Sequence, residues 1–165
     1  MSEYPKFIRH WRELEGADED HYADSSELLS IGAPIGQLLG LTRIGIHHER
    51  LPPGRRTSYP HAESAEEEFV FVLEGNPDVW IDGRLYNLKP GTAVAFPAGT
   101  GICHTFLNNT ESEVRLLVIG EKPKPENLVH YPMNPGYEST RKDAWSDVPP
   151  RDLGGHDGKA RAKLK

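Results

Sequence analysis

The segment Ser58–Gly75, SYPHAESAEEEFVFVLEG, places one histidine and four glutamates directly before five consecutive apolar residues. The run Phe69–Leu73 is apolar at every position, which predicts a strand that is covered on both faces. A cluster of acids ordinarily forms a solvated surface, and a solvated surface is not expected directly beside a strand that is buried on both faces. We therefore interpret some of these acids as facing a metal ion.

The composition favours one β-rich domain. The chain has 165 residues with 16 glycines and 14 prolines, and so many turn-forming residues favour short strands over a helical bundle. A net charge of −6 argues against a nucleic-acid partner, which would need clustered Lys and Arg. No apolar run approaches the ~20 residues of a membrane span, so no membrane association is expected. The lack of a signal-type apolar segment and the single cysteine, Cys103, predict a cytoplasmic location.

Turn signals divide the central part of the chain into short strands. Residues 38–51 read as one or two strands, and Pro52-Pro53-Gly54 ends them. Asp82-Gly83 joins two short runs and predicts a hairpin, because glycine tolerates the positive φ of a tight turn. Further strands are expected at 69–73, 92–96, 104–107 and 114–119. Seven or eight such strands predict an all-β sandwich or small barrel.

The sequence also predicts how the chain is organised around this barrel. We expect the barrel to comprise residues 38–121 and an N-terminal arm, 1–37, to pack on it. Residues 122–165 are rich in proline, glycine and charge, which predicts an irregular C-terminal arm.

Four side chains from three strand starts could meet inside the barrel mouth. His61 and Glu63 are two residues apart, so they share a face where the chain is extended. Glu68 has the opposite parity, and a bend after Glu63 is needed to bring it to the same side. His104 begins a later strand. Two imidazoles and two carboxylates would then form a workable set of ligands for a divalent metal.

These residues resemble the two motifs of the cupin family over about residues 50–121. Glu68, followed by six residues and Gly75, fits the end of the first motif, and His61 and Glu63 stand where its two histidines stand. The second motif is matched by Gly91, Pro97, Gly99, His104 and Asn108, with a longer gap before His104 than the common form has. The resemblance implies a double-stranded β-helix, or jelly-roll, barrel in which His61, Glu63, Glu68 and His104 bind one metal ion.

Glu63 departs from the family pattern, because a histidine usually stands at its position. Two carboxylates would neutralise a divalent ion, which lowers the cost of burying the site. Oxygen ligands also move the preference toward Zn, Mn or Fe and away from copper. The alternative is that Glu63 turns to solvent and that the site is degraded or empty.

Other polar residues near the motifs have simpler interpretations. Glu66 and Glu67 fit a solvated acidic rim, Cys103 fits packing away from the metal, and Asn108 fits a brace for its turn. A general base would have to come from Glu66, His48 or a tyrosine. Both faces of the Phe69–Leu73 strand need a cover, and because similar cupins often pair through such faces, we expect a homodimer.

Two functions remain open from the sequence. The first is a small metal-dependent enzyme of oxygenase, isomerase or lyase type that acts on a small polar molecule. The second is a non-catalytic module that binds or senses a metal or small ligand. The fold serves both classes and does not decide between them.

Overall fold

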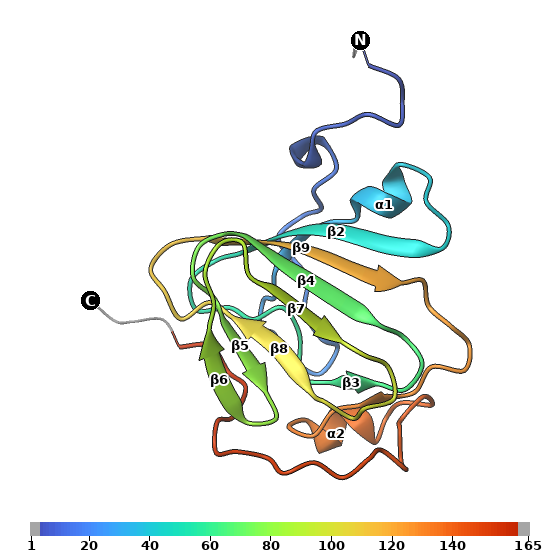
Figure 1. Cartoon of the computed structure of the whole chain (residues 1–165), viewed down its shortest axis with the longest axis vertical. Coiled ribbons are helices and arrows are strands. Elements are labelled where there is room, and N and C mark those ends of the chain that lie inside the picture. The colour runs from blue at the N-terminus through green and yellow to red at the C-terminus, as the bar shows by residue number, and fades with distance from the viewer. Residues whose placement is uncertain (1–3, 162–165) are drawn as a thin grey trace.

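A computed structural model describes residues 4–161 and shows that the regular secondary structure of the chain is mostly strand (Figure 1). A five-stranded antiparallel sheet has the order β1-β2-β9-β4-β7, and its strands are β1 (Ile31–Ala33), β2 (Ile44–Leu51), β9 (Val114–Glu121), β4 (Glu68–Glu74) and β7 (Ala93–Phe96). A three-stranded sheet contains β6 (Arg84–Asn87), β5 (Asp78–Ile81) and β8 (His104–Leu107), and a two-stranded sheet pairs β3 (Ala62–Glu63) with β10 (Val129–His130). The helical segments are the 3-10 turn η1 (Trp11–Glu13), α1 (Ile35–Leu38) and α2 (Pro135–Glu138). The predicted jelly-roll fold class is confirmed.

The main hydrophobic core lies between the five-stranded and three-stranded sheets. Its buried residues come from both sheets and from the loops that join them: Leu51, Val70, Val72, Val79, Leu88, Phe96, Phe106, Val114 and Leu116. Val70 and Val72 of β4 face this core, whereas Phe69 is exposed on the opposite face. The strand is therefore apolar on both faces, as its sequence predicts, but only its inner face is fully buried.

The register of β2 decides which of its polar side chains enter the barrel. Glu49 lies opposite Leu116 of β9, which in turn lies opposite Val72, so all three share the inner face. His48 and Arg50 point outward by alternation. The His48 ring stacks on Trp11 at a centroid distance of 4.0 Å, and this contact holds the N-terminal segment against the outside of the sheet.

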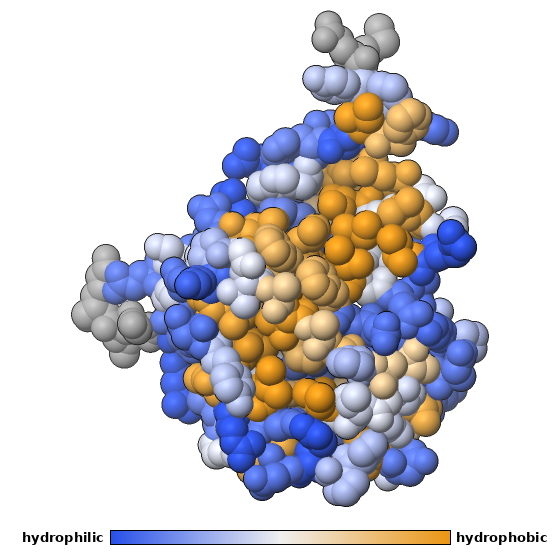
Figure 2. All heavy atoms as spheres, viewed as in Figure 1, coloured by the Kyte–Doolittle hydropathy of each residue, from blue (hydrophilic) through white to orange (hydrophobic). Residues whose placement is uncertain are grey.

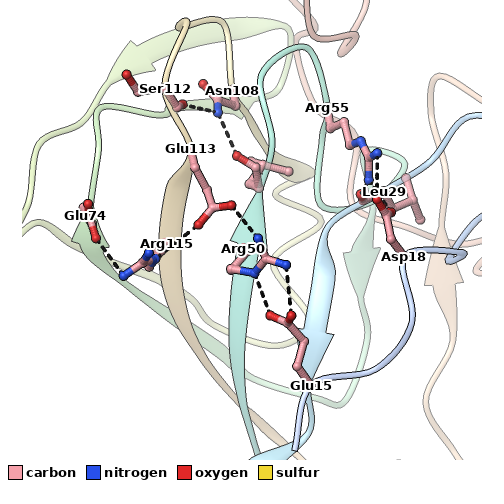
Figure 3. A network of polar contacts seen from close by, with 11 residues as sticks. Glu15, Asp18, Leu29, Arg50, Arg55, Glu74, Asn108, Ser112, Glu113 and Arg115 are labelled. Carbon is pink, nitrogen blue, oxygen red and sulfur yellow. Dashed lines mark hydrogen bonds and ion pairs between the residues drawn. The ribbon is translucent and has the colours of Figure 1, made fainter. Parts of the chain in front are cut away.

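Ion pairs fasten the N-terminal segment to the barrel (Figure 3). Arg50 donates to both oxygens of Glu15, at 2.6 and 2.9 Å, and to Glu113 at 2.7 Å. Arg55 binds Asp18 at 2.6 Å. These contacts fix residues 15–29 beside the barrel and bring the chain into β1, next to β2.

Two local predictions had different outcomes. The Asp82-Gly83 hairpin is confirmed, and both residues have the positive φ, 45° and 80°, of the predicted turn. The strand prediction from residue 38 is wrong at its start, because Leu38 ends α1 and β2 begins at Ile44. Gly40, with φ of 95°, reverses the chain after α1.

The C-terminal segment packs along the barrel. β10 pairs with β3, so that Val129 lies opposite Glu63. The indole of Trp80 donates to the carbonyl of His156 at 2.8 Å, and Trp145 is buried in a cluster with Trp80. Over residues 4–161, no helix is long and apolar enough to cross a membrane.

Candidate metal centre

Three of the four predicted ligands meet at one end of the barrel. His61 and His104 form an isolated antiparallel bridge, with backbone N–H to carbonyl distances of 3.2 and 2.9 Å in the two directions. Glu68 begins β4 and faces inward with Val70, as predicted once the chain bends after Glu63. One ligand atom from each of His61, Glu68 and His104 lies within 4.8 Å of the others. Such spacing allows all three to bind a single ion.

Neighbouring groups hold the two imidazoles in place. Nδ1 of His61 donates to the carbonyl of Tyr59 at 2.9 Å, which leaves Nε2 available as a ligand. The His104 ring stacks on Phe96 with centroids 3.4 Å apart and planes only 5° from parallel. His104 Nε2 lies 3.0 Å from Glu68 Oε1. A buried imidazole nitrogen, Nδ1 of His104, has no hydrogen-bond partner within the described residues.

The charge states of these groups suit a cation. Burial, together with the neighbouring His104, lowers the pKa of His61 to about 4, so this imidazole is neutral and able to coordinate. Burial alone would raise the pKa of Glu68, but the hydrogen bond and charge of His104 outweigh it and lower this pKa below its usual value. Two imidazoles and one carboxylate form a donor set that zinc and non-haem iron sites use. The residues present therefore fit a mononuclear metal.

Glu63 lies next to this group without belonging to it. It lines a cavity of about 220 Å³ together with Glu68 and Glu66. Burial and the adjacent acids, above all Glu66, raise the pKa of Glu63 to about 8, and its carboxyl is hydrogen-bonded to Glu66. Glu66 also accepts the backbone N–H of Lys124 at 2.6 Å. Whether Glu63 is a fourth ligand remains a prediction.

Glu49, an ionisable residue that the motifs do not contain, lines an inner cavity beside the three candidate ligands. This cavity of about 90 Å³ is bounded by His61, Glu68 and His104 together with Glu49, Thr57, Ser58, Val70, Phe106 and Val118. Oε2 of Glu49 accepts a hydrogen bond of 2.7 Å from the Ser30 hydroxyl. Burial raises the pKa of Glu49 to about 7, although the Ser30 bond opposes the rise. Alternation along β2 places His47 and Glu49 on the face opposite His48, but it does not show which of the two faces is the inner one.

The remaining polar candidates lie outside this cavity or serve the fold. His48 is under Trp11 on the outer face, so it does not reach the donors as a base. Cys103 is buried beside Trp80, and burial raises its thiol pKa to about 12, which agrees with a packing role. Asn108 donates to the carbonyls of Leu51 and Ser112 at 2.7 and 2.8 Å (Figure 3) and braces the turn as predicted.

Comparison with known proteins agrees with this geometry. Residues 47–120 match the family model of the cupin domain. Over these residues the chain is similar to the cupin domain. The match includes His61, Glu68, His104 and residues 47–51 of β2, so the resemblance seen in the two motifs is confirmed. No curated protein matches the chain.

Solved structures with cupin-like folds include two with related descriptions. A protein from Silicibacter pomeroyi DSS-3, described as a sugar phosphate isomerase of the cupin superfamily, is 32% identical over 62% of this chain, with a TM-score of 0.60. The chain spans only 64% of that protein. A protein from Acidithiobacillus ferrooxidans, named for a proposed sugar phosphate isomerase activity, is 25% identical, with 77% and 81% of the two chains covered and a TM-score of 0.69.

A third solved structure shares the fold alone. The polyketide cyclase RemF from Streptomyces resistomycificus is 20% identical, with 82% and 94% of the two chains covered and a TM-score of 0.62. The same architecture thus occurs in proteins with differently named activities, and the activity of this chain has to be argued from its own site.

Proposed function

We propose that the protein is a small metal-dependent enzyme that uses one divalent ion to act on a small polar molecule. The observation that carries this proposal is the convergence of His61, Glu68 and His104, whose ligand atoms lie within 4.8 Å of one another beside an internal cavity. Three protein ligands leave coordination positions for water or substrate, as in catalytic rather than structural sites.

The donor set restricts the metal and the chemistry. His61, Glu68 and His104 would hold Zn, Mn or Fe, and Glu63 would add a second carboxylate if its proton were displaced. Such an ion would polarise a carbonyl or activate water, and iron would permit oxygen chemistry. Isomerase, lyase and oxygenase activities are therefore the ones to assay.

The lining of the cavities favours an uncharged or cationic molecule. In the described part of the chain, neither the 90 Å³ cavity nor the 220 Å³ cavity is lined by a lysine or arginine, while Glu49, Glu63 and Glu68 line one or both. A phosphate group would meet no guanidinium or ammonium here, and such groups are the usual phosphate partners. The isomerase names of the two similar structures therefore support a metal-dependent isomerase more than a phosphorylated substrate.

The small volume of the inner cavity supports an alternative. A space of about 90 Å³ holds only a few water molecules or a very small ligand. The cupin domain would then bind or sense a metal or small ligand without turnover.

Elemental analysis of the purified protein, before and after reconstitution with Zn, Mn and Fe, tests the proposal. We expect close to one ion per chain in wild type. The metal-loaded protein is then assayed with uncharged polyols, aldoses and amines, each beside its phosphorylated counterpart. Metal binding without turnover of any of them would favour the binding module, and no metal after reconstitution would refute the metal centre.

We further propose that two copies pair through the outer face of the five-stranded sheet. Ile44 and Phe69 are more than a third exposed there, with Leu38 and Leu41 nearby on the chain, and Figure 2 shows apolar side chains gathered over this face. The N-terminal segment covers His48, and the C-terminal segment packs on β3, so neither covers Phe69. Light scattering should give a dimer for wild type and a monomer for Phe69→Glu; a monomeric wild type would refute the pairing.

A buried, free Cys103 is compatible with the predicted cytoplasmic location.

A further inference from the structure

The inner cavity contains one ionisable side chain that is not a candidate metal ligand. Of the described residues around the 90 Å³ cavity, His61, Glu68 and His104 supply the metal donors, and Glu49 is the remaining group that can gain or lose a proton. We propose that Glu49 exchanges a proton with the molecule bound beside the metal and that Ser30 orients its carboxyl group. This inference rests on the proposed function, because it presumes a ligand at the metal centre.

The backbone around Glu49 holds it in a defined position. Glu49 lies in the middle of β2, opposite Gly32 of β1 and Leu116 of β9, so strands flank it on both sides. Ser30 is only 8% exposed, and its hydroxyl group donates a hydrogen bond to Oε2 of Glu49 at 2.7 Å. The next residue, Arg50, is fastened outside to Glu15. One carboxyl oxygen is thereby occupied by Ser30, and the other is left for a ligand.

Neighbouring ionisable groups act on the Glu49 carboxyl group. The carboxylates of Glu68 and Asp20 raise its pKa in addition to burial, and the Ser30 hydroxyl lowers it. His61 and His104 border the same cavity, and His47 lies two residues away on the same face. A carboxyl group in such surroundings can act as a base or as an acid, whereas an exposed glutamate would stay ionised.

Two other candidate bases, Glu66 and Tyr59, form hydrogen bonds with other residues and lie outside the inner cavity. Glu66 accepts the backbone N–H of Lys124 and shares a hydrogen bond with Glu63. The Tyr59 hydroxyl donates to Asp24 at 3.0 Å, and burial raises the pKa of Tyr59 above its usual value. Neither residue lines the inner cavity. Glu49, in contrast, lines both the inner cavity and the more open 220 Å³ cavity, through which a proton can reach solvent.

Acetohydroxamic acid is a suitable probe, because its binding to a metal as the hydroxamate requires the loss of one proton. As the probe binds, the O–H bond of the neutral acid would break and its proton would form an O–H bond with the Glu49 carboxylate. A zinc ion held by His61, Glu68 and His104 would accept the hydroxamate. The Zn-loaded full-length protein is titrated with this probe from acidic to alkaline pH. The variants are Glu49→Gln, Ser30→Ala and, as a matched control far from the cavity, Glu74→Gln, whose exposed carboxylate pairs with Arg115.

We expect all four proteins to bind one zinc ion and to have similar melting curves. Glu49→Gln should bind the probe about 10- to 100-fold more weakly near neutral pH, as expected for the loss of a hydrogen bond to a charged group. Its affinity should rise with pH up to the probe's own pKa, because the proton then goes to solvent, whereas the affinity of wild type should level off once Glu49 is ionised. Ser30→Ala should give a smaller loss, and Glu74→Gln none. Equal probe affinity in Glu49→Gln and wild type would overturn the role of Glu49 and leave the metal centre standing.

Metal content separates this inference from the proposed function. Loss of zinc from Glu49→Gln alone would make Glu49 a ligand and overturn its role in proton exchange. Failure of wild type to take up zinc would overturn both proposals. If Glu49→Gln does not fold, Ser30→Ala decides: unchanged affinity and pH dependence in that variant would refute the orientation of Glu49 by Ser30.

Discussion

Replacing Glu63 with glutamine should remove a pH-dependent penalty on the stability of the metal-free protein. The folded-state pKa of Glu63 is about 8, against an ordinary value of 4.5, because the carboxyl is buried beside other acids. The difference, 8 − 4.5, is about 3.5 pH units, and at about 1.4 kcal/mol per unit the upper limit is ~5 kcal/mol. Partial exposure of the side chain and movement of Glu66 reduce this limit, so we expect ~2 kcal/mol.

The sign follows from proton binding. The folded protein holds the Glu63 proton more tightly than the unfolded chain, so its contribution to stability is complete below the unfolded pKa and is lost as pH rises toward the folded pKa. Urea unfolding after EDTA treatment, at about pH 5 and about pH 8.5, measures this loss. Wild type should lose ~2 kcal/mol more than Glu63→Gln over this interval, and Glu67→Gln, an exposed neighbour, should behave as wild type. Parallel pH slopes in all three proteins would refute the burial of a protonated Glu63.

Three further predictions concern the candidate metal ligands and the hydrophobic core. His104→Ala should abolish metal uptake while Glu66→Ala leaves it nearly intact, as measured by elemental analysis; equal loss in both would show that Glu66 is itself a ligand. Glu63→His should change metal affinity and preference in competition titrations, and unaltered values would mean that Glu63 is not a ligand. Leu116→Ala, at a fully buried core position, should cost about 2–5 kcal/mol in urea unfolding, and a loss of under about 1 kcal/mol would contradict its place in the core.

The strands at the centre of the barrel could be predicted from the sequence, because the turn residues and the alternation of apolar residues agree there. The Asp82-Gly83 turn fixed one hairpin, and alternation placed Glu68 with the inward valines of β4. His61 and His104 are far apart in sequence, and only the spacing of two motifs connected them. The structure explains that spacing, because their backbones hydrogen-bond to each other directly.

Glu49 and the beginning of β2 could not be predicted from local patterns. His47, His48 and Glu49 are consecutive polar residues, and neither face of such a strand is marked as buried by its side chains. Long-range contacts decide which face of β2 is buried. Trp11 stacks on His48 and Glu15 binds Arg50, and both contacts lie on the outer face. These partners lie more than thirty residues away, in a segment whose sequence has no clear period.

The outward anchoring of Arg50 is therefore part of the chemistry of the cavity. A slip of β2 by one residue would exchange the two faces of the strand. Arg50 or His48 would then enter the inner cavity, Glu49 would face Trp11, and the hydrogen bond to Ser30 would be lost. Burying the Arg50 guanidinium beside His61, Glu68 and His104 would add a cation where the proposed metal ion would bind. The ion pairs of Arg50 with Glu15 and Glu113 outside the barrel thus favour the register that places the Glu49 carboxyl group, and no arginine, beside the candidate metal ligands.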